Sequence, residues 1–338
     1  MFHIKKILIT EFYFVSLLFV TNTMADHASP SFETGAAGAI MTIPGATLPK
    51  GEMVFGFGAQ FIELDDISDV ELENLGAADE DVHSVDHLLS LTANIAYGIT
   101  DDFTVGASLP YLERNDIREA HNDMGTGEAE FAGDSKGIGD LSLFGQYRFY
   151  RNQNLDMAML AGLKLATGDT SEREVEGALF ESEQQPGSGS VDPFLGLAMN
   201  HNRGRTGFSA NILYTFTSEG SQQTELGDIF NYNLALSYRV YSPQGAHDHH
   251  QHRHVLNILD YVDLALELNG DVRDRIEIHG TEEENSGGHV LFISPGIRVG
   301  LGHRWSLFSS IGIPVLNDHN GQQSEPEYRL IGGLSKTF

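Results

Sequence analysis

The chain has 338 residues, 48 acidic and 20 basic side chains, a formal net charge of −28, and no cysteine. The lack of cysteine excludes disulfides, thiolate metal sites, iron–sulfur clusters and a lipoprotein anchor. The acidic balance argues against a nucleic-acid partner, because phosphate contacts need clustered Lys and Arg. A mean hydropathy of −0.20 argues against a bundle of membrane helices. A secreted or envelope protein, all-β or mixed, remains.

Residues 1–25 have the layout of a signal peptide. Lys5 and Lys6 form a basic start, an apolar stretch covers residues 7–20, and Thr23 and Ala25 provide small residues before a cut. The alternative is an uncleaved anchor helix, but this stretch is short for a bilayer core of about 30 Å. The sequence therefore predicts cleavage after Ala25.

Residues 26–50 precede the first predicted strand, and their small and apolar composition includes two prolines in residues 31–50. This N-terminal segment either lies in the periplasm or enters the fold as a partial plug. The sequence leaves both alternatives open.

From residue 51 to the C-terminus, apolar residues alternate with polar or small ones, which is the pattern of a sheet with two different faces. In residues 260–270, for example, Val262, Leu264, Leu266 and Leu268 alternate with residues such as Glu267. The pattern predicts strands at 51–61, 88–97, 103–111, 139–150, 155–165, 191–200, 205–216, 228–240, 260–270, 289–300, 304–314 and 327–338.

These segments have about 9 to 13 residues, longer than the five or six usual in soluble sheets and close to what a membrane-spanning strand needs. We therefore predict an all-β fold over residues 51–338, a transmembrane antiparallel β-barrel of about 12 strands. The apolar face would contact lipid and the polar face would line the lumen.

The inward face also carries charges of both signs. They either line a polar path or hold the wall together as ion pairs, and the sequence does not decide between the two. The acidic members are Glu52, Asp140, Asp156, Asp192, Asp263 and Glu267, and the basic ones are Arg148, Lys164, Arg239 and Arg298.

Connection lengths predict the orientation, because outer-membrane barrels have short periplasmic turns and long outer loops. Short links occur at 98–102, 151–154, 201–204 and 302–303, and long ones at 62–87, 112–138, 166–190, 217–227, 271–288 and 315–326. The link 241–259 is an exception on the inner side. Both chain ends would be periplasmic, and a final strand ending in Phe338 predicts recognition by the barrel assembly machinery.

Four stretches resemble the outer-membrane transporter family named after the meta-pathway of phenol degradation. They are YGITDDFTVGASLPY (97–111), GIGDLSLFGQYRFY (137–150), LATGDT (165–170) and GSGSVDPFLGLAMN (187–200). The resemblance implies a 12-stranded outer-membrane barrel of a Gram-negative bacterium, loosely similar to fatty-acid and aromatic-hydrocarbon channels, that passes small and often hydrophobic or aromatic compounds. It supplies no catalytic residues.

A histidine-rich stretch in the exceptional link departs from that family. His247, His249, His250, His252 and His254 lie within eight residues, and neutral imidazoles bind Zn, Cu or Ni well. One interpretation is a metal-binding periplasmic turn; the other is a solvated insertion. Apart from such a metal, we expect no cofactor.

The first long loop, 62–87, is acidic and contains a smaller histidine cluster. His83, Asp86 and His87 could form a cation site with Asp79, Glu80 and Asp81, although a solvated loop is the alternative. The segment GDSKG (133–137) places Ser135 in a pattern distantly like that of a serine-protease nucleophile, but an ordinary loop explains it better. Since no phosphate-binding or dinucleotide motif is present, we do not expect an enzyme.

The sequence thus predicts an outer-membrane channel that allows passive passage of small solutes, with the lipid bilayer and the solute as partners. The alternative hypothesis is a metal-associated outer-membrane protein with the histidine-rich turn as its site.

Overall fold

The computed structural model describes residues 37–338 except for residues 81, 244–257 and 303. Within these residues, no helix combines the length and apolar character that a membrane crossing requires.

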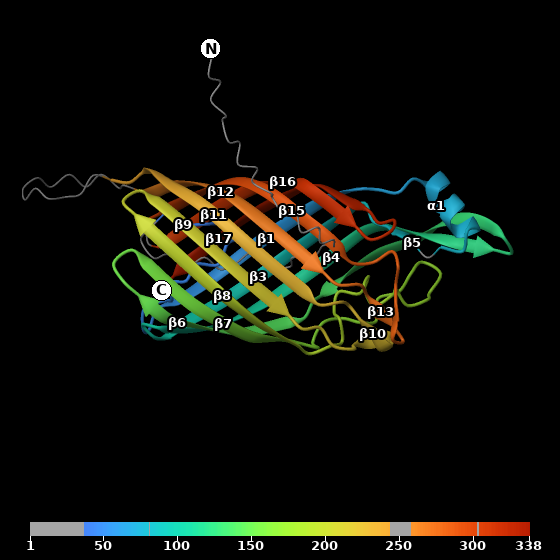
Figure 1. Cartoon of the computed structure of the whole chain (residues 1–338), viewed down its shortest axis with the longest axis horizontal. Helices are drawn as coiled ribbons and strands as arrows, with labels where there is room; N and C mark the ends of the chain where they lie inside the picture. The colour runs from blue at the N-terminus through green and yellow to red at the C-terminus, as the bar shows by residue number, and fades with distance from the viewer. Residues whose placement is uncertain (1–36, 81, 244–257, 303) are drawn as a thin grey trace, which may run out of the picture.

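In the described part of the chain, twelve long strands form a closed antiparallel barrel (Figure 1). In order around the wall they are β1 (Met53–Asp65), β3 (His87–Thr100), β4 (Phe103–Asp123), β6 (Leu141–Arg151), β7 (Leu155–Leu165), β8 (Asp192–Arg203), β9 (Thr206–Thr215), β11 (Ile229–Tyr241), β12 (Leu259–Arg273), β15 (Gly288–Leu301), β16 (Trp305–His319) and β17 (Glu325–Thr337). The first strand pairs with the last, from Val54 opposite Thr337 to Asp65 opposite Glu325, which closes the cylinder. The predicted fold class is confirmed, and each predicted segment overlaps one of these strands.

The two faces of the wall differ as the alternation predicts. In β12 the side chains of Leu264, Leu266 and Leu268 point outward and are exposed, whereas Asp263 and Glu267 are buried inside the barrel. The same outward apolar belt includes Phe55 and Phe57 of β1. An apolar exterior of this kind is stable only against lipid.

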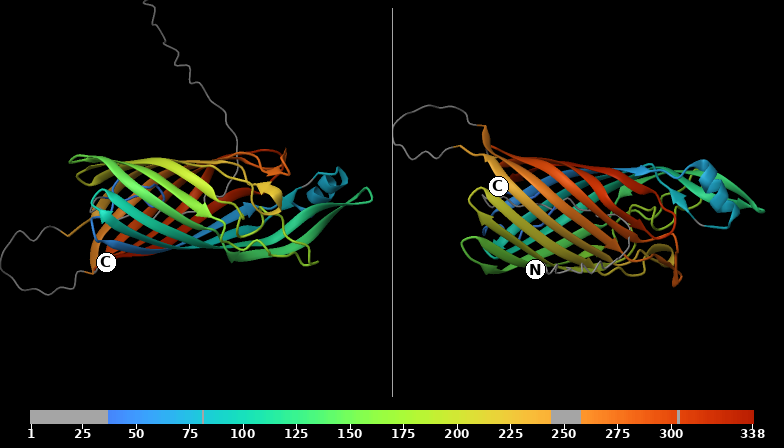
Figure 2. Two further views of the ribbon diagram at one scale, coloured as in Figure 1. Left: turned by 90° about the horizontal axis from the view of Figure 1, so that it is seen from below. Right: turned by 45° about the horizontal axis from the view of Figure 1, so that its top comes forward.

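At the outer end, the wall extends beyond the span that a bilayer needs. Strand β4 runs on to Asp123 and β5 (Thr126–Ile138) returns beside it as a long hairpin. Helix α1 (Asp69–Ala77) lies against this hairpin (Figure 2). The long outer connection predicted at 112–138 thus contains a hairpin that the sequence did not indicate, because outside the bilayer a hairpin needs no apolar face and its sequence lacks the alternating signal.

The remaining short elements also belong to the outer connections. They are β2 (His83–Ser84), the 3-10 turn η1 (Ser221–Gln223), β10 (Thr224–Glu225), β13 (Glu277–Ile278) and β14 (Thr281–Glu282). Strand β2 pairs with β4, while β10, β13 and β14 form a small separate sheet. The short turns and the C-terminus lie at the opposite end of the barrel from α1 (Figure 1).

Candidate functional site

Residues 37–50, the described part of the N-terminal segment, lie inside the barrel against the inward face of the wall. Backbone N–H groups of Ile40, Met41 and Thr42 all donate to the carboxylate of Glu267 on β12, at 3.0 Å for Met41 and 3.1 Å for Thr42. Glu267 is 1% exposed. A buried carboxylate is stable only when hydrogen bonds replace its lost hydration, and here the segment provides them.

Further contacts carry the segment across the lumen, from β15 to β4. The Arg298 guanidinium donates to the carbonyl oxygen of Ala39 at 2.5 Å, and the Gln146 amide donates to that of Pro44 at 2.7 Å. Farther along, the N–H of Leu48 donates to the hydroxyl of Thr104 at 2.9 Å. The described residues 37–50 thus lie inside the barrel and contact its wall on several strands.

A cavity of about 680 Å³ lies inside the barrel. Met41 and Ile43 of the N-terminal segment line one side of it, and residues of the outer connections, including Gln184, Leu226 and Ile276, line another. The N-terminal segment therefore bounds the cavity on the side of the short turns, and the outer loops bound it at the opposite end of the barrel.

The lining of this cavity is amphipathic. Apolar side chains gather on β3, β4, β6, β7 and β8: Leu88, Pro110, Leu112, Phe144, Leu160 and Phe194. Amide side chains gather on β9, β11 and β12: Asn211, Asn231, Asn233 and Asn269. Two of these amides contact each other, since Nδ2 of Asn269 donates to the side-chain oxygen Oδ1 of Asn233 at 2.9 Å. Such a lining suits a solute with an apolar body and a hydrogen-bonding group.

Most of the inward charges form ion pairs. Lys164 lies 2.7 Å from Asp192 and 3.5 Å from Asp140, and Arg239 contacts Asp263 at 2.8 Å. Of the two interpretations of these charges, the structure therefore supports ion pairs within the wall. Because Lys164, Asp140 and Asp192 also line the cavity, the same side chains give one part of it a polar surface.

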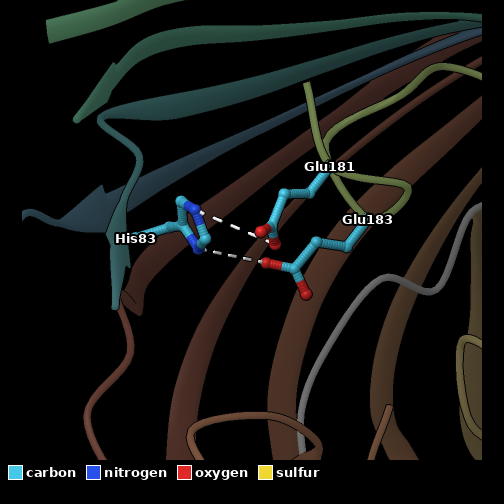
Figure 3. A group of neighbouring side chains, drawn as sticks. All are labelled: His83, Glu181 and Glu183. Carbon is cyan, nitrogen blue, oxygen red and sulfur yellow. Dashed lines mark ion pairs between the residues drawn. The ribbon is translucent and has the colours of Figure 1, made fainter. Parts of the chain in front are cut away.

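The outer mouth of the cavity holds a cluster of a histidine and three glutamates, of which Figure 3 shows His83, Glu181 and Glu183. His83 of β2 places Nε2 3.4 Å from Glu119 of β4 and 3.9 Å from Glu181, and places Nδ1 3.5 Å from Glu183. Burial opposes protonation of His83, but the carboxylates of Glu119, Glu183 and Glu181 raise its pKa to about 10. We call His83, Glu119, Glu181 and Glu183 the mouth cluster.

The structure gives His83 partners other than the candidate cation ligands that the sequence suggested, of which Asp81 lies outside the described residues. His87 pairs with its neighbour Asp86, with 2.9 Å between Nδ1 and Oδ2, whereas His83 faces glutamates from distant parts of the chain. No local spacing connects residue 83 to residues 119, 181 and 183, so the sequence alone did not reveal this group.

Two other predicted sites have different outcomes. His247, His249, His250, His252 and His254 lie outside the described residues, so the metal-binding hypothesis for that turn stays a prediction. Ser135 is buried in β5, and its hydroxyl donates to the carbonyl oxygen of Gln184 at 2.6 Å. Ser135 therefore serves as an anchor for the outer loop 166–190.

A closed barrel with an apolar exterior and a polar lumen that holds an internal cavity defines the class of outer-membrane β-barrel channels. A family described by the words MetA-pathway of phenol degradation matches residues 76–250, just over half of the chain. The chain belongs to this family, which confirms the resemblance found in the sequence.

One solved structure agrees with this fold at a TM-score above 0.5. An outer membrane channel from Pseudomonas putida F1 is 16% identical, with a TM-score of 0.56, and the match covers 87% of this chain and 97% of that one. The toluene transporter TbuX of Ralstonia pickettii is 9% identical at a TM-score of 0.44, covering 86% and 90%. The P. putida toluene transporter TodX is 11% identical at 0.41, covering 86% and 91%. The comparison with curated proteins found no match.

Proposed function

We propose that the protein is a passive outer-membrane channel for small amphipathic solutes, of which simple aromatic compounds are the best-fitting class. The observation that carries this proposal is the cavity of about 680 Å³ with its apolar and amide-lined sides. The aromatic class is supported by the family's connection with phenol degradation and by the rings of Phe144 and Phe194 in the lining.

The N-terminal segment lies between this cavity and the periplasmic end of the barrel, since Met41 and Ile43 line the cavity. A solute that leaves toward the periplasm must pass this segment. We propose that the segment is displaced or repacked during passage, with the bonds to Glu267 and Arg298 setting how often this occurs.

The test is solute entry into proteoliposomes that contain the full chain. We expect phenol to enter faster than into protein-free vesicles, and glucose, which has no apolar body, to gain much less. Equal entry of phenol with and without folded protein would overturn the proposal.

A substitution in the lining provides the specificity control. Phe194→Asn removes an apolar ring from the cavity, and we expect it to reduce the preference for phenol over glucose. The matched control is Phe208→Asn on the neighbouring strand β9, because Phe208 is on the exposed outer face and does not line the cavity.

A further inference from the structure

We propose that His83, Glu181 and Glu183 of the mouth cluster bind a divalent transition-metal ion such as Zn²⁺, with Glu119 as an additional ligand or as a hydrogen-bond acceptor beside it. One ring nitrogen of His83 and one oxygen from each of Glu181 and Glu183 lie within 4.8 Å of one another. Imidazole with carboxylates is a ligand set that Zn²⁺ uses, usually with a water in the remaining position.

The contacts between His83 and the glutamates are longer than usual hydrogen bonds. The three distances from the His83 ring nitrogens to carboxylate oxygens are 3.4, 3.5 and 3.9 Å, whereas N–H···O hydrogen bonds usually measure about 2.7–3.2 Å. In a tetrahedral site with metal–ligand bonds of about 2.1 Å, neighbouring ligand atoms lie about 3.4 Å apart. Glu119 and Glu181 face Nε2 of His83, whereas Glu183 faces Nδ1, so only one of the two ring nitrogens would bind the ion. That nitrogen and one oxygen each of Glu181 and Glu183 lie within 4.8 Å of one another, and small changes in side-chain torsion angles would bring these three atoms to the spacing of ligands around one ion.

Charge also favours a cation here. Three carboxylates surround a single imidazole, so even a protonated His83 leaves an excess of negative charge. The excess extends to Glu174, whose pKa is raised by burial and by the negative charges of Glu119 and Glu130. A divalent ion bound to His83 would release the imidazole proton to solvent and would still add one net positive charge to the mouth cluster.

The loop that carries two of the ligands is held in place by its own contacts. Phe180, next to Glu181, is fully buried in a core with Ile62, Leu64 and Val85. The Gln185 amide donates to the carbonyl oxygen of Phe180 at 2.7 Å. Glu181 and Glu183 are thus positioned before any ion arrives, which lowers the entropic cost of binding.

The position of the site suggests what the ion does. His83, Glu181 and Glu183 all line the cavity at its outer mouth, and they come from β2 and from the outer loop 166–190 (Figure 3). A shared ion would crosslink these two segments and hold the loop across the entrance. This inference is independent of which solute passes through the channel.

The experiment is a calorimetric titration of ZnCl₂ into the folded full-length chain in detergent. The background variant has His247, His249, His250, His252 and His254 all changed to Ala, so that the predicted turn site contributes no heat. We expect one Zn²⁺ per chain in this background. Affinity should fall at least about tenfold in His83→Ala and in Glu181→Gln/Glu183→Gln, since even loss of a residue that supports a ligand typically costs 10–100-fold.

His87→Ala is the matched control, because His87 is close to His83 in the chain, at the start of β3, but pairs with Asp86; its isotherm should equal that of the background. Heat-modifiable migration on a detergent gel confirms that each variant is folded. Should His83→Ala fail to fold, the double glutamine variant decides, because its substitutions lie in a loop outside the strands. The absence of Zn²⁺ binding by the folded background, or equal affinities in the background and the folded variants, would overturn the proposal.

Discussion

Thr42 and Glu267 are joined inside the barrel by two hydrogen bonds: the backbone N–H and the hydroxyl of Thr42 donate to Oε2 of Glu267 at 3.1 and 3.2 Å. Met41 donates to the same oxygen at 3.0 Å. One carboxylate of the wall therefore collects several donors of the N-terminal segment. We therefore expect this side chain to contribute strongly to holding the segment against the wall.

Glu267→Gln tests this dependence. The substitution keeps the side-chain size but removes the charge, and its NH₂ group would face N–H donors. Hydrogen bonds to a charged group are worth about 1.5–3 kcal/mol each, so the displaced fraction of the segment should rise about 10- to 100-fold. Single-channel recording in planar bilayers measures this as more frequent or longer open events.

Asp271→Asn is the control for that experiment. Asp271 is also a buried carboxylate on β12, but it accepts a bond from Asn231 of the wall at 2.5 Å. We expect its substitution to leave the opening frequency close to that of the unmodified protein. An equal effect of both variants would mean that lumen charge, and not the anchoring of the segment, controls opening.

Gly45 provides a steric test of the same segment. A Cβ at Gly45 would lie 2.6 Å from the backbone oxygen of Asp156, whereas one at Gly38 would come no closer than 3.5 Å to Arg298. Gly45→Ala should therefore push the segment away from the wall at a cost of about 1–3 kcal/mol, and Gly38→Ala should not. Limited proteolysis near the N-terminus checks this, with faster cleavage expected only for Gly45→Ala; equal cleavage of the two variants would contradict the close packing.

The membrane-spanning wall was predictable because the bilayer imposes a rule on every strand. Each strand must present apolar side chains outward and satisfy its backbone within the sheet, so the signal recurs in each segment. The prediction for residues 155–165 coincides with β7, and the neighbouring strands differ from their predicted bounds by a few residues. Where the rule ends, at the outer surface, the extension of β4 to Asp123 and the strand β5 were missed.

The candidate sites were harder to predict, because they depend on residues far apart in the chain. Glu267 was recognisable as an inward charge, but its partners Ile40 to Thr42 are more than 200 residues away. His83 was noted as a candidate cation ligand with nearby acidic residues, whereas its actual neighbours come from β4 and from the loop 166–190. Alternation specifies which face a side chain is on, but it does not specify which loop folds over it.

Arg148 is expected to stabilise the periplasmic rim of the barrel. Its buried guanidinium contacts Asp102 at 2.8 Å and Asp156 at 3.3 Å. Arg148→Met should lower the free energy of unfolding by roughly 3 kcal/mol, the lower part of the range for breaking a buried ion pair, because Asp102 is half-exposed and keeps part of its hydration. Urea unfolding from lipid vesicles, followed by the fluorescence of Trp305, measures this value.

Arg151→Met is the matched control for the rim. Arg151 ends the same strand β6 and is exposed, so its loss should change the free energy of unfolding by no more than about 0.5 kcal/mol. If the two variants lost equal stability, the buried pairs of Arg148 would not be the cause.

The orientation of β12 and β16 in the bilayer gives a test of the barrel itself. Leu266 is in the middle of β12 and points outward, while Val315 points outward near the outer end of β16. An arginine on the lipid face costs about 2–4 kcal/mol at the midplane and about 0–1 kcal/mol near the interface. Leu266→Arg should therefore destabilise the vesicle-embedded barrel by at least about 1 kcal/mol more than Val315→Arg does.

In detergent micelles, where water reaches the belt more easily, the difference should shrink. Equal costs in vesicles would show that Leu266 does not lie at the centre of the membrane, and the assignment of the apolar belt to lipid would then have to be abandoned.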